Sequence, residues 1–371
     1  MSLDLRYGEV EEQLRASVRA VLADHCPPSA VLAGLEQPGP ADPRLWRLLA
    51  VELGLAGLAV PEHLGGAGAG PRELAVVLEE LGRAVAPVPY LGTAGTAVAA
   101  LSVCAQVPEA ARLLTAIAGG AVVALAVPFS TAPGGSLVTT VAATGDVLAG
   151  TVTSVADALG ADVLLVPAAS GLQTGLYAVD AAAPGVRRAA VVSLDQTRPL
   201  CDLTLSAVPA RPLALGATAA AAMWAALFTG AALLASEQLG VAQWCLDATV
   251  AHLRERRQFG RVVGSYQALK HRLADLWVEL AQGRAVARYA AACAAAGDPD
   301  ASVAAALAQA HCSPLAVRAA EECVQLHGGI GFTWEHPAHL YLKRARSAAL
   351  ALGGAGRHRA LLAELVDLPP G

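Results

Sequence analysis

The sequence has few charged residues, few aromatic residues and no surplus of positive charge. Only 15% of its 371 residues are Asp, Glu, Lys or Arg, 4% are aromatic, and the formal net charge is −5. A nucleic-acid-binding protein needs a basic surface to neutralise phosphates, so this composition argues against such a partner. The seven cysteines include no Cys-x-x-Cys pair, so neither a metal site nor a disulfide framework is predicted. We expect buried, reduced thiols in a cytoplasmic protein.

The sequence also lacks clear targeting or membrane-spanning segments. Its first residues carry no basic segment followed by an apolar run, so no signal peptide is expected. The uncharged stretch 213–236 is long enough to span a bilayer. However, it is largely alanine with Gly, Ser and Thr, and an amphipathic helical pattern continues from it. We therefore interpret it as a buried helix of a soluble protein, with no membrane partner.

The pattern of apolar residues changes twice and predicts three domains. Residues 1–118 have helical periodicity, with Pro27-Pro28 ending one helix and Asp42 placed to cap another that begins at Pro43. Residues 119–212 hold short Val-, Leu- and Thr-rich runs between turn residues, typical of a small antiparallel β-domain. These runs cover residues 121–127, 147–155, 162–166, 176–180, 189–194 and 203–208. From residue 213 to 371 the periodicity predicts a C-terminal helical bundle.

A cluster of cations interrupts the helical pattern of this last domain. The sequence Arg254-Glu255-Arg256-Arg257-Gln258-Phe259-Gly260-Arg261 places four arginines within eight residues. Apolar residues recur at helical spacing on both sides, so the cluster is predicted to be the corner between two long helices. We interpret Gly260 as the residue that stops the first helix. The cluster is either a solvated helix end or a site for a phosphate and a planar ring.

Three motifs, in this order and spacing, together resemble the acyl-CoA dehydrogenase family. One is early: Pro61-Glu62, Gly65-Gly66-Ala67-Gly68 and Glu79-Glu80-Leu81-Gly82-Arg83. The next is Arg256-Arg257-Gln258-Phe259-Gly260 with Tyr266-Gln267, Lys270-His271 and Ala274-Asp275, and the last is Gln325-Leu326-His327-Gly328-Gly329-Ile330-Gly331-Phe332. The resemblance implies a mainly α fold with a central β-domain, between an N-terminal helical domain and a C-terminal helical bundle. It also implies FAD, an acyl-CoA substrate and an electron-transfer flavoprotein partner.

In the family, FAD lies across a subunit interface, so each subunit serves two half-sites. One subunit holds the flavin ring and supplies a catalytic base, while its neighbour holds the pyrophosphate and adenosine. The residues of this chain that match the neighbour's half are Arg256, Gln258, Phe259, Gln267, Gln325, Gly328 and Gly329. The resemblance implies that these seven residues contact the cofactor.

The half that would serve this chain itself is altered. The family's glutamate base, which removes the substrate's α-proton, occupies one of two positions; here they fall on Leu352 and Gly230, and neither residue can accept a proton. Other carboxylates are weaker candidates, since Glu237 lies about two turns further along the same helix, and Glu335 and Asp275 match positions that the family does not use as base. No catalytic residue and no metal ligand is therefore predicted.

The segments that contact the flavin ring in active relatives also differ. Residues 128–136, Pro-Phe-Ser-Thr-Ala-Pro-Gly-Gly-Ser, keep small residues but lose two acids, and residues 152–155, Val-Thr-Ser-Val, replace a Trp-x-Thr/Ser element. The pattern resembles the base-less subunit of actinobacterial α2β2 enzymes, including ones that act on steroid side-chain CoA esters. The hypothesis is a subunit, inactive alone, that completes the FAD site of a homologous partner bearing the glutamate. Two alternatives remain: a homo-oligomeric flavoenzyme with altered chemistry, and a flavin-free structural partner.

Overall fold

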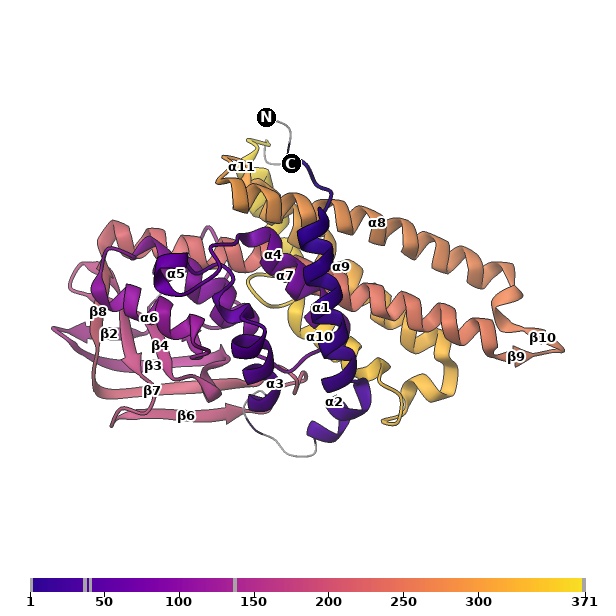
Figure 1. Ribbon diagram of the computed structural model, residues 1–371, viewed down its shortest axis with the longest axis horizontal. Coiled ribbons are helices and arrows are strands. Elements are labelled where there is room, and N and C mark those ends of the chain that lie inside the picture. The colour runs from indigo at the N-terminus through magenta and orange to yellow at the C-terminus, as the bar shows by residue number, and fades with distance from the viewer. Residues whose placement is uncertain (1–2, 36–38, 40–41, 136–138, 369–371) are drawn as a thin grey trace.

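The computed structural model describes residues 3–35, 39, 42–135 and 139–368. Helices, a central β-sheet and a helical bundle follow one another along the chain, which confirms the predicted fold class. Figure 1 shows the sheet at one end of the molecule and an arm of two long helices, α7 and α8, extending toward the other. The residues predicted from the sequence to bind the cofactor lie at the hairpin end of this arm, at the start of α8 and at the end of α9.

The N-terminal part consists of helices joined by short turns. Its elements are α1 (Glu9–His25), α2 (Pro28–Gly34), α3 (Pro43–Arg47), η1 (Leu48–Glu52), η2 (Leu55–Gly57), η3 (Glu62–Leu64), α4 (Pro71–Ala84), η4 (Leu91–Ala97), α5 (Val98–Val103) and α6 (Pro108–Ala118). Asp42 caps α3 as predicted, because its Oδ1 accepts the backbone N–H groups of Arg44 and Leu45 at 2.9 and 3.1 Å. The helix predicted to begin at Pro43 continues from α3 directly into the π-helical turn η1.

The central sheet is mixed rather than purely antiparallel, which corrects one expectation. Its strands are β1 (Val123–Leu125), β2 (Val141–Thr144), β3 (Val147–Ala156), β4 (Val163–Ser170), β5 (Gln173–Asp180), β6 (Val186–Val191), β7 (Leu200–Pro209) and β8 (Arg211–Leu215), with the short turn η5 (Ala158–Gly160) after β3. The order is β6-β7-β3-β2-β4-β5-β8, with β1 beside β4. Strands β1 and β2 run parallel to β4, while the other pairs are antiparallel.

The C-terminal bundle is built from long, alanine-rich helices. These are α7 (Gly216–Glu255), α8 (Gln267–Ala296), α9 (Ala301–His327), α10 (Ala338–Ala348) and α11 (Ala355–Leu365). The first helix begins at Gly216 rather than at residue 213, because residues 211–215 pair with β5 as the unpredicted edge strand β8. Helix α7 is apolar and long enough to cross a membrane, but 61% of its most apolar window is buried inside the protein. That burial is typical of the core helix of a bundle.

A glycine crossing joins the N-terminal helices to the bundle. A Cβ atom placed on Gly82 of α4 would lie 2.1 Å from the Glu237 carbonyl oxygen of α7. A Cβ atom on Gly240 of α7 would lie 1.9 Å from the Glu79 carbonyl oxygen of α4. The two backbones are therefore in direct contact, and only glycine fits at either position. This contact explains the glycine of the early Glu-Glu-Leu-Gly-Arg motif.

Candidate functional site

The two positions that the family uses for its base lie against each other in this chain. A Cβ atom on Gly230 of α7 would lie 3.0 Å from Leu352 Cδ1 and 2.7 Å from Thr96 Cγ2 of η4. Leu352, between α10 and α11, is 4% exposed, and Gly230 is buried. Residues far apart in sequence thus meet at one point, as two alternative positions for the same base would. Leu352 fills that point with hydrocarbon.

The segments expected at the flavin ring are bonded to this same point. The Phe129 backbone N–H donates to the Ser154 carbonyl oxygen at 3.0 Å, and the Leu352 N–H donates to the Phe129 carbonyl oxygen at 2.7 Å. The Ser154 N–H in turn donates to Asp202 Oδ1 at 2.8 Å. These backbone groups are satisfied within the chain and are not free to bind a ring. Ser136, the last residue of the first segment, lies outside the described residues.

Glu237, the nearest alternative carboxylate, is held in a buried ion-pair network. Its Oε1 lies 3.2 Å from Arg344 Nη1, and its Oε2 accepts a hydrogen bond from Arg198. Arg344 also lies 2.7 Å from Asp195 Oδ2 through Nε and donates to Thr197 Oγ1 at 2.6 Å. Burial opposes ionisation of Glu237, but the charges of Arg198 and Arg344 outweigh it and lower the pKa of the carboxyl. Both carboxylate oxygens are occupied, so Glu237 links the sheet to the bundle rather than acting as a base.

The other two carboxylates weighed from the sequence are exposed, and a buried one beside η4, Asp157, was missed by the sequence analysis. Asp275 on α8 and Glu335 after η7 (Gly328–Phe332) are exposed and lie outside the Leu352 region. Asp157, at the end of β3, is 8% exposed, and burial raises the pKa of its carboxyl to about 6. Its Oδ2 would be 2.3 Å from a Cβ atom on Gly92 of η4, one turn before Thr96. The only sequence signal for Asp157 is its position shortly after the altered segment 152–155.

The arginine cluster forms a β-hairpin instead of a helix stop. Helix α7 ends at Glu255 and Arg256 is extended, followed by β9 (Arg257–Gln258) and β10 (Arg261–Val262). Phe259 and Gly260 have φ values of 51° and 74°, which are the backbone angles of a two-residue hairpin turn. Gly260 is therefore a turn residue and not the helix C-terminal stop that the sequence suggested. Phe259 is 91% exposed at the tip of the hairpin.

The glycine-rich loop predicted to bind adenosine starts beside the end of α7. His252 of α7 and His327 at the end of α9 have ring centroids 4.4 Å apart, so the two helix ends are neighbours. Gly328 has φ 65°, ψ −140°, a conformation that glycine tolerates. A Cβ atom on Gly329 would have no neighbour within 4 Å, so its backbone can be approached from outside. Gln325 is exposed on the last turn of α9.

Three histidines lie side by side at the ends of α7 and α9 and after η7. The rings of His327 and His336 are 4.3 Å apart. His327 Nδ1 donates to the Cys323 carbonyl oxygen at 2.7 Å. Burial opposes protonation of His327, but its bonds to Cys323 raise its pKa overall, whereas burial and the neighbouring His327 lower the pKa of His252. Burial and the nearby imidazoles lower the pKa of His336 to about 4. The lowered pKa values of His252 and His336 therefore favour the neutral form of these two rings.

The exposed groups at the hairpin end of the arm and on the loop after α9 suit an anionic ligand that carries an aromatic ring. Arg256, Gln258, Phe259, Gln267, Gln325, Gly328 and Gly329 are all exposed. A guanidinium offers a planar fork to phosphate oxygens, an exposed aromatic ring can stack, and open glycine backbone can approach a ligand closely. No group of His, Cys, Asp and Glu suited to a metal ion occurs in the described ranges. All seven cysteines are free and buried.

Comparisons with known proteins agree with this architecture. Residues 8–121 match the family model for the acyl-CoA dehydrogenase N-terminal domain, and residues 219–366 match that for the C-terminal domain. The acyl-CoA dehydrogenase IpdE2 of Mycolicibacterium smegmatis is 39% identical over 346 residues, which cover 93% of this chain and 95% of that protein. The acyl-CoA dehydrogenase FadE27 of Mycobacterium tuberculosis is 32% identical over 384 residues, which cover 99% of this chain and 100% of that protein.

Solved structures of two-protein assemblies are also similar to this chain. A chain of the Tcur3481-Tcur3483 steroid ACAD variant has a TM-score of 0.84 and 36% identity, covering 97% of this chain and 98% of that one. A chain of the ChsE4-ChsE5 complex from Mycobacterium tuberculosis has a TM-score of 0.86 and 28% identity, with 100% of both chains covered.

Proposed function

Because this chain belongs to the acyl-CoA dehydrogenase family, we propose that it is a base-less subunit of a heteromeric, FAD-dependent acyl-CoA dehydrogenase in the cytoplasm. A homologous partner subunit supplies the glutamate, and this chain completes the partner's FAD site. The two-protein names of the similar solved structures support a heteromer, and one of them is called a steroid enzyme. A steroid side-chain CoA ester is therefore the substrate class to test first.

One observation carries the proposal. The chain is closed at the point where its own base would act, and exposed at the hairpin and the glycine-rich loop that would serve a neighbour. Leu352 and Gly230 seal the first region, and the Phe129 backbone is bonded across it. The hairpin at the end of α7 instead presents an exposed Arg256, and the loop after α9 an unobstructed Gly329. A chain that also served its own half-site would need the first region to be open as well.

Each exposed residue has a defined role in this proposal. FAD, when bound, accepts the hydride from the substrate's β-carbon. Arg256 binds the pyrophosphate through charge-assisted hydrogen bonds, which are about twice as strong as neutral ones. Phe259 packs against the dinucleotide, and Gln325 with the Gly329 backbone holds the adenosine end. Gln258, Gln267 and Gly328 complete the same surface.

The decisive experiment measures flavin in the assembled complex. The chain is co-expressed with a homologue that carries the glutamate, and Arg256→Ala is compared with Arg187→Ala, which removes an exposed arginine of β6. Arg256→Ala should lower both the FAD-to-protein ratio and turnover with electron-transfer flavoprotein as acceptor, and Arg256→Lys should restore only part. Arg187→Ala should change neither. Full FAD occupancy in the Arg256→Ala complex would contradict the proposal.

Activity of the isolated chain separates the other two hypotheses. Losing a positioned base costs about 10²–10⁴-fold, so the chain alone should not dehydrogenate acyl-CoA. If it does, and Asp157→Asn abolishes the activity, the chain is a flavoenzyme with altered chemistry, because Asp157 is the buried carboxyl whose pKa is raised to about 6. If the complex keeps its flavin regardless of every arm substitution, the chain is a structural partner.

A further inference from the structure

A cavity lies between the N-terminal helices and the edge of the sheet, apart from the arm. Its volume is about 680 Å³, which is within the range of pockets that hold drug-sized molecules. Figure 1 shows strand β6 ending toward α2 and α3, with the β9–β10 hairpin at the far end of the molecule. The cavity is therefore separate from the residues assigned to the cofactor.

Two walls, both largely apolar, enclose this cavity. The helical wall consists of the end of α1, helix α2 and the start of α3, and includes Val31 and Pro43. The sheet wall consists of the end of β6 and the loop before β7, and includes Ala190 and Pro199. Val192, which also lines the cavity, is 98% exposed. Aliphatic side chains left open to water on a concave surface indicate a site that an apolar molecule covers.

The polar groups of the cavity select the charge of its ligand. Asp42 and His25 lie on the helical wall, and Ser193 and Gln196 lie on the sheet wall. No Lys or Arg is among the described residues that line the cavity. An anion would meet the Asp42 carboxylate without a cation to compensate it, so the phosphates of CoA or FAD do not suit this site. A hydroxyl group can exchange hydrogen bonds with all four polar side chains.

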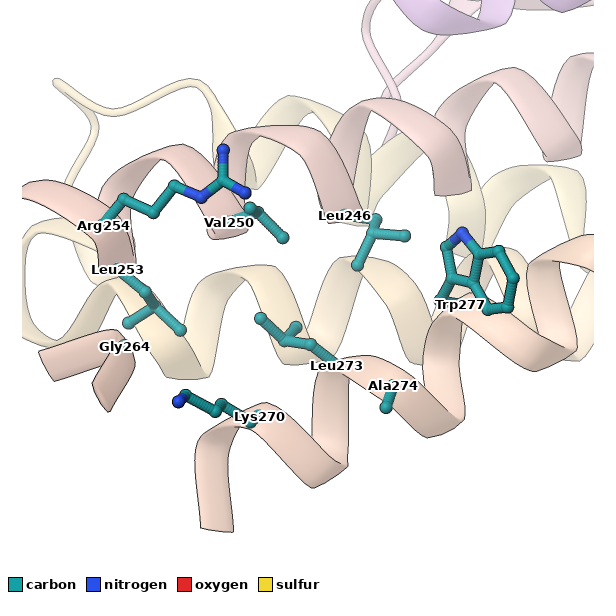
Figure 2. Close-up of a pocket in the computed structure, with 9 residues that line it drawn as sticks. All are labelled: Leu246, Val250, Leu253, Arg254, Gly264, Lys270, Leu273, Ala274 and Trp277. Carbon is teal, nitrogen blue, oxygen red and sulfur yellow. The ribbon is translucent and has the colours of Figure 1, made fainter. Parts of the chain in front are cut away.

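The groove between α7 and α8 has the opposite electrostatic character. Figure 2 shows Arg254 and Lys270 beside an apolar lining that includes Leu246 and Leu273. Gln267, one of the residues predicted to contact the cofactor, lies one turn before Lys270 on α8. The groove therefore suits anionic ligands near the hairpin, whereas the cavity at β6 suits a neutral molecule.

The cavity shares a loop with the buried ion-pair network. Asp195 and Thr197 contact Arg344, while Gln196 and Pro199 of the same loop line the cavity. A ligand that fills the cavity therefore supports the loop that links the sheet to the bundle. Because such a ligand binds the folded state and not the unfolded one, it should raise the melting temperature of the chain.

We propose that this cavity binds a neutral ring alcohol, with a fused hydrocarbon skeleton between the apolar walls and a hydroxyl group that donates to Asp42. A rigid skeleton loses less conformational freedom on binding than a flexible chain of the same size. The choice of a steroid skeleton rests on the function proposed above, since one similar structure is called a steroid enzyme. The cavity itself needs neither FAD nor a partner subunit, so its ligand is the free alcohol and not a CoA ester.

A pair of ligands that differ in charge tests this assignment. Dehydroepiandrosterone is a neutral steroid alcohol, and its sulfate ester carries a negative charge on the same skeleton. Equilibrium dialysis of the purified chain, alone and in its heteromeric complex, should show saturable binding of one alcohol per chain. The sulfate should bind at least about tenfold more weakly. Asp42→Asn, which keeps a good helix cap, should narrow this difference. Equal binding of the two ligands by the wild type, or no saturable binding of the alcohol, overturns the proposal.

Substitutions at two adjacent residues of β6 locate the site. Ala190→Trp places a bulky ring in the cavity and should weaken binding of the alcohol by about tenfold or more. Ala189→Trp is the matched control, because Ala189 is also exposed but points to the other face of the strand. The alcohol should raise the melting temperature of the wild type and of Ala189→Trp, but not that of Ala190→Trp. Undiminished binding by Ala190→Trp overturns the proposal. These assays need neither flavin nor turnover, so their failure is distinct from that of the flavin test on Arg256→Ala.

Discussion

Replacing Leu352 with glutamate returns a carboxyl group to one of the family's base positions, and we expect it to destabilise the chain. The leucine side chain is 4% exposed and lies against Gly230 and η4. Full burial of a leucine contributes about 1.5–3 kcal/mol. Burial of a carboxyl without a charged partner raises its pKa by up to about 3–5 units. Each unit corresponds to about 1.36 kcal/mol once the group is forced to ionise.

The destabilisation should therefore increase with pH. The glutamate pKa is about 4.3 in the unfolded chain and higher in the folded one, so between these values the folded state binds more protons. The free energy of unfolding then falls by up to about 1.36 kcal/mol per pH unit across that window and levels off above the folded-state pKa. Near pH 5 we expect a loss of about 2–3 kcal/mol from the missing leucine. Near pH 8 the loss should be about 3 kcal/mol larger.

Urea unfolding followed by circular dichroism at both pH values measures these differences. Leu350→Glu is the matched control, since Leu350 lies two residues away and is 70% exposed. Its effect should be under about 0.5 kcal/mol. Equal stability of the two variants, or a pH-independent loss at Leu352, would mean that the region is open to water. The argument for a closed site would then fail.

The other stability predictions follow from the buried charges and the histidine cluster. Arg344→Leu should cost about 3–5 kcal/mol in unfolding free energy, because it leaves Asp195 and Glu237 short of their buried cation; a loss below about 1 kcal/mol would refute this. His336 has a folded-state pKa of about 4, below the unfolded value of about 6.5, so its contribution is full above pH 6.5 and is lost as the pH falls toward 4. His336→Gln should therefore lose less stability than the wild type between about pH 7 and pH 5; identical slopes would contradict the assignment.

Local patterns predicted those features that depend on near neighbours in sequence. The Asp42 cap, the helix stop before Pro27 and the order of helices, strands and helices all follow from propensity and periodicity. The spacing from the motifs also identified Gly230 and Leu352 as the two base positions, and the fold brings these residues into contact. Strand β8 was missed because apolar residues just before a helix continue its pattern, and β2 because it has only four residues.

Features that depend on distant neighbours could not be predicted from the sequence alone. The sequence Phe259-Gly260 is as typical of a helix end as of a hairpin turn, because a glycine with positive φ occurs in both. The raised pKa of Asp157 reflects burial that only the packed structure shows. Glu237 has no nearby cation in sequence, because its two arginines come from the loop before β7 and from α10.

The Arg344 network also constrains the order in which the chain can mature on the ribosome. Arg344 follows its partners Asp195 and Glu237 by 149 and 107 residues. Synthesis at about 5–20 residues per second delays its arrival by about 5–20 s after Glu237. During that interval the nascent chain holds two carboxylates and only Arg198 to neutralise them. The buried carboxylates at this junction therefore gain their second cation only after α10 leaves the exit tunnel, and a chaperone has that interval in which to bind the unfinished protein.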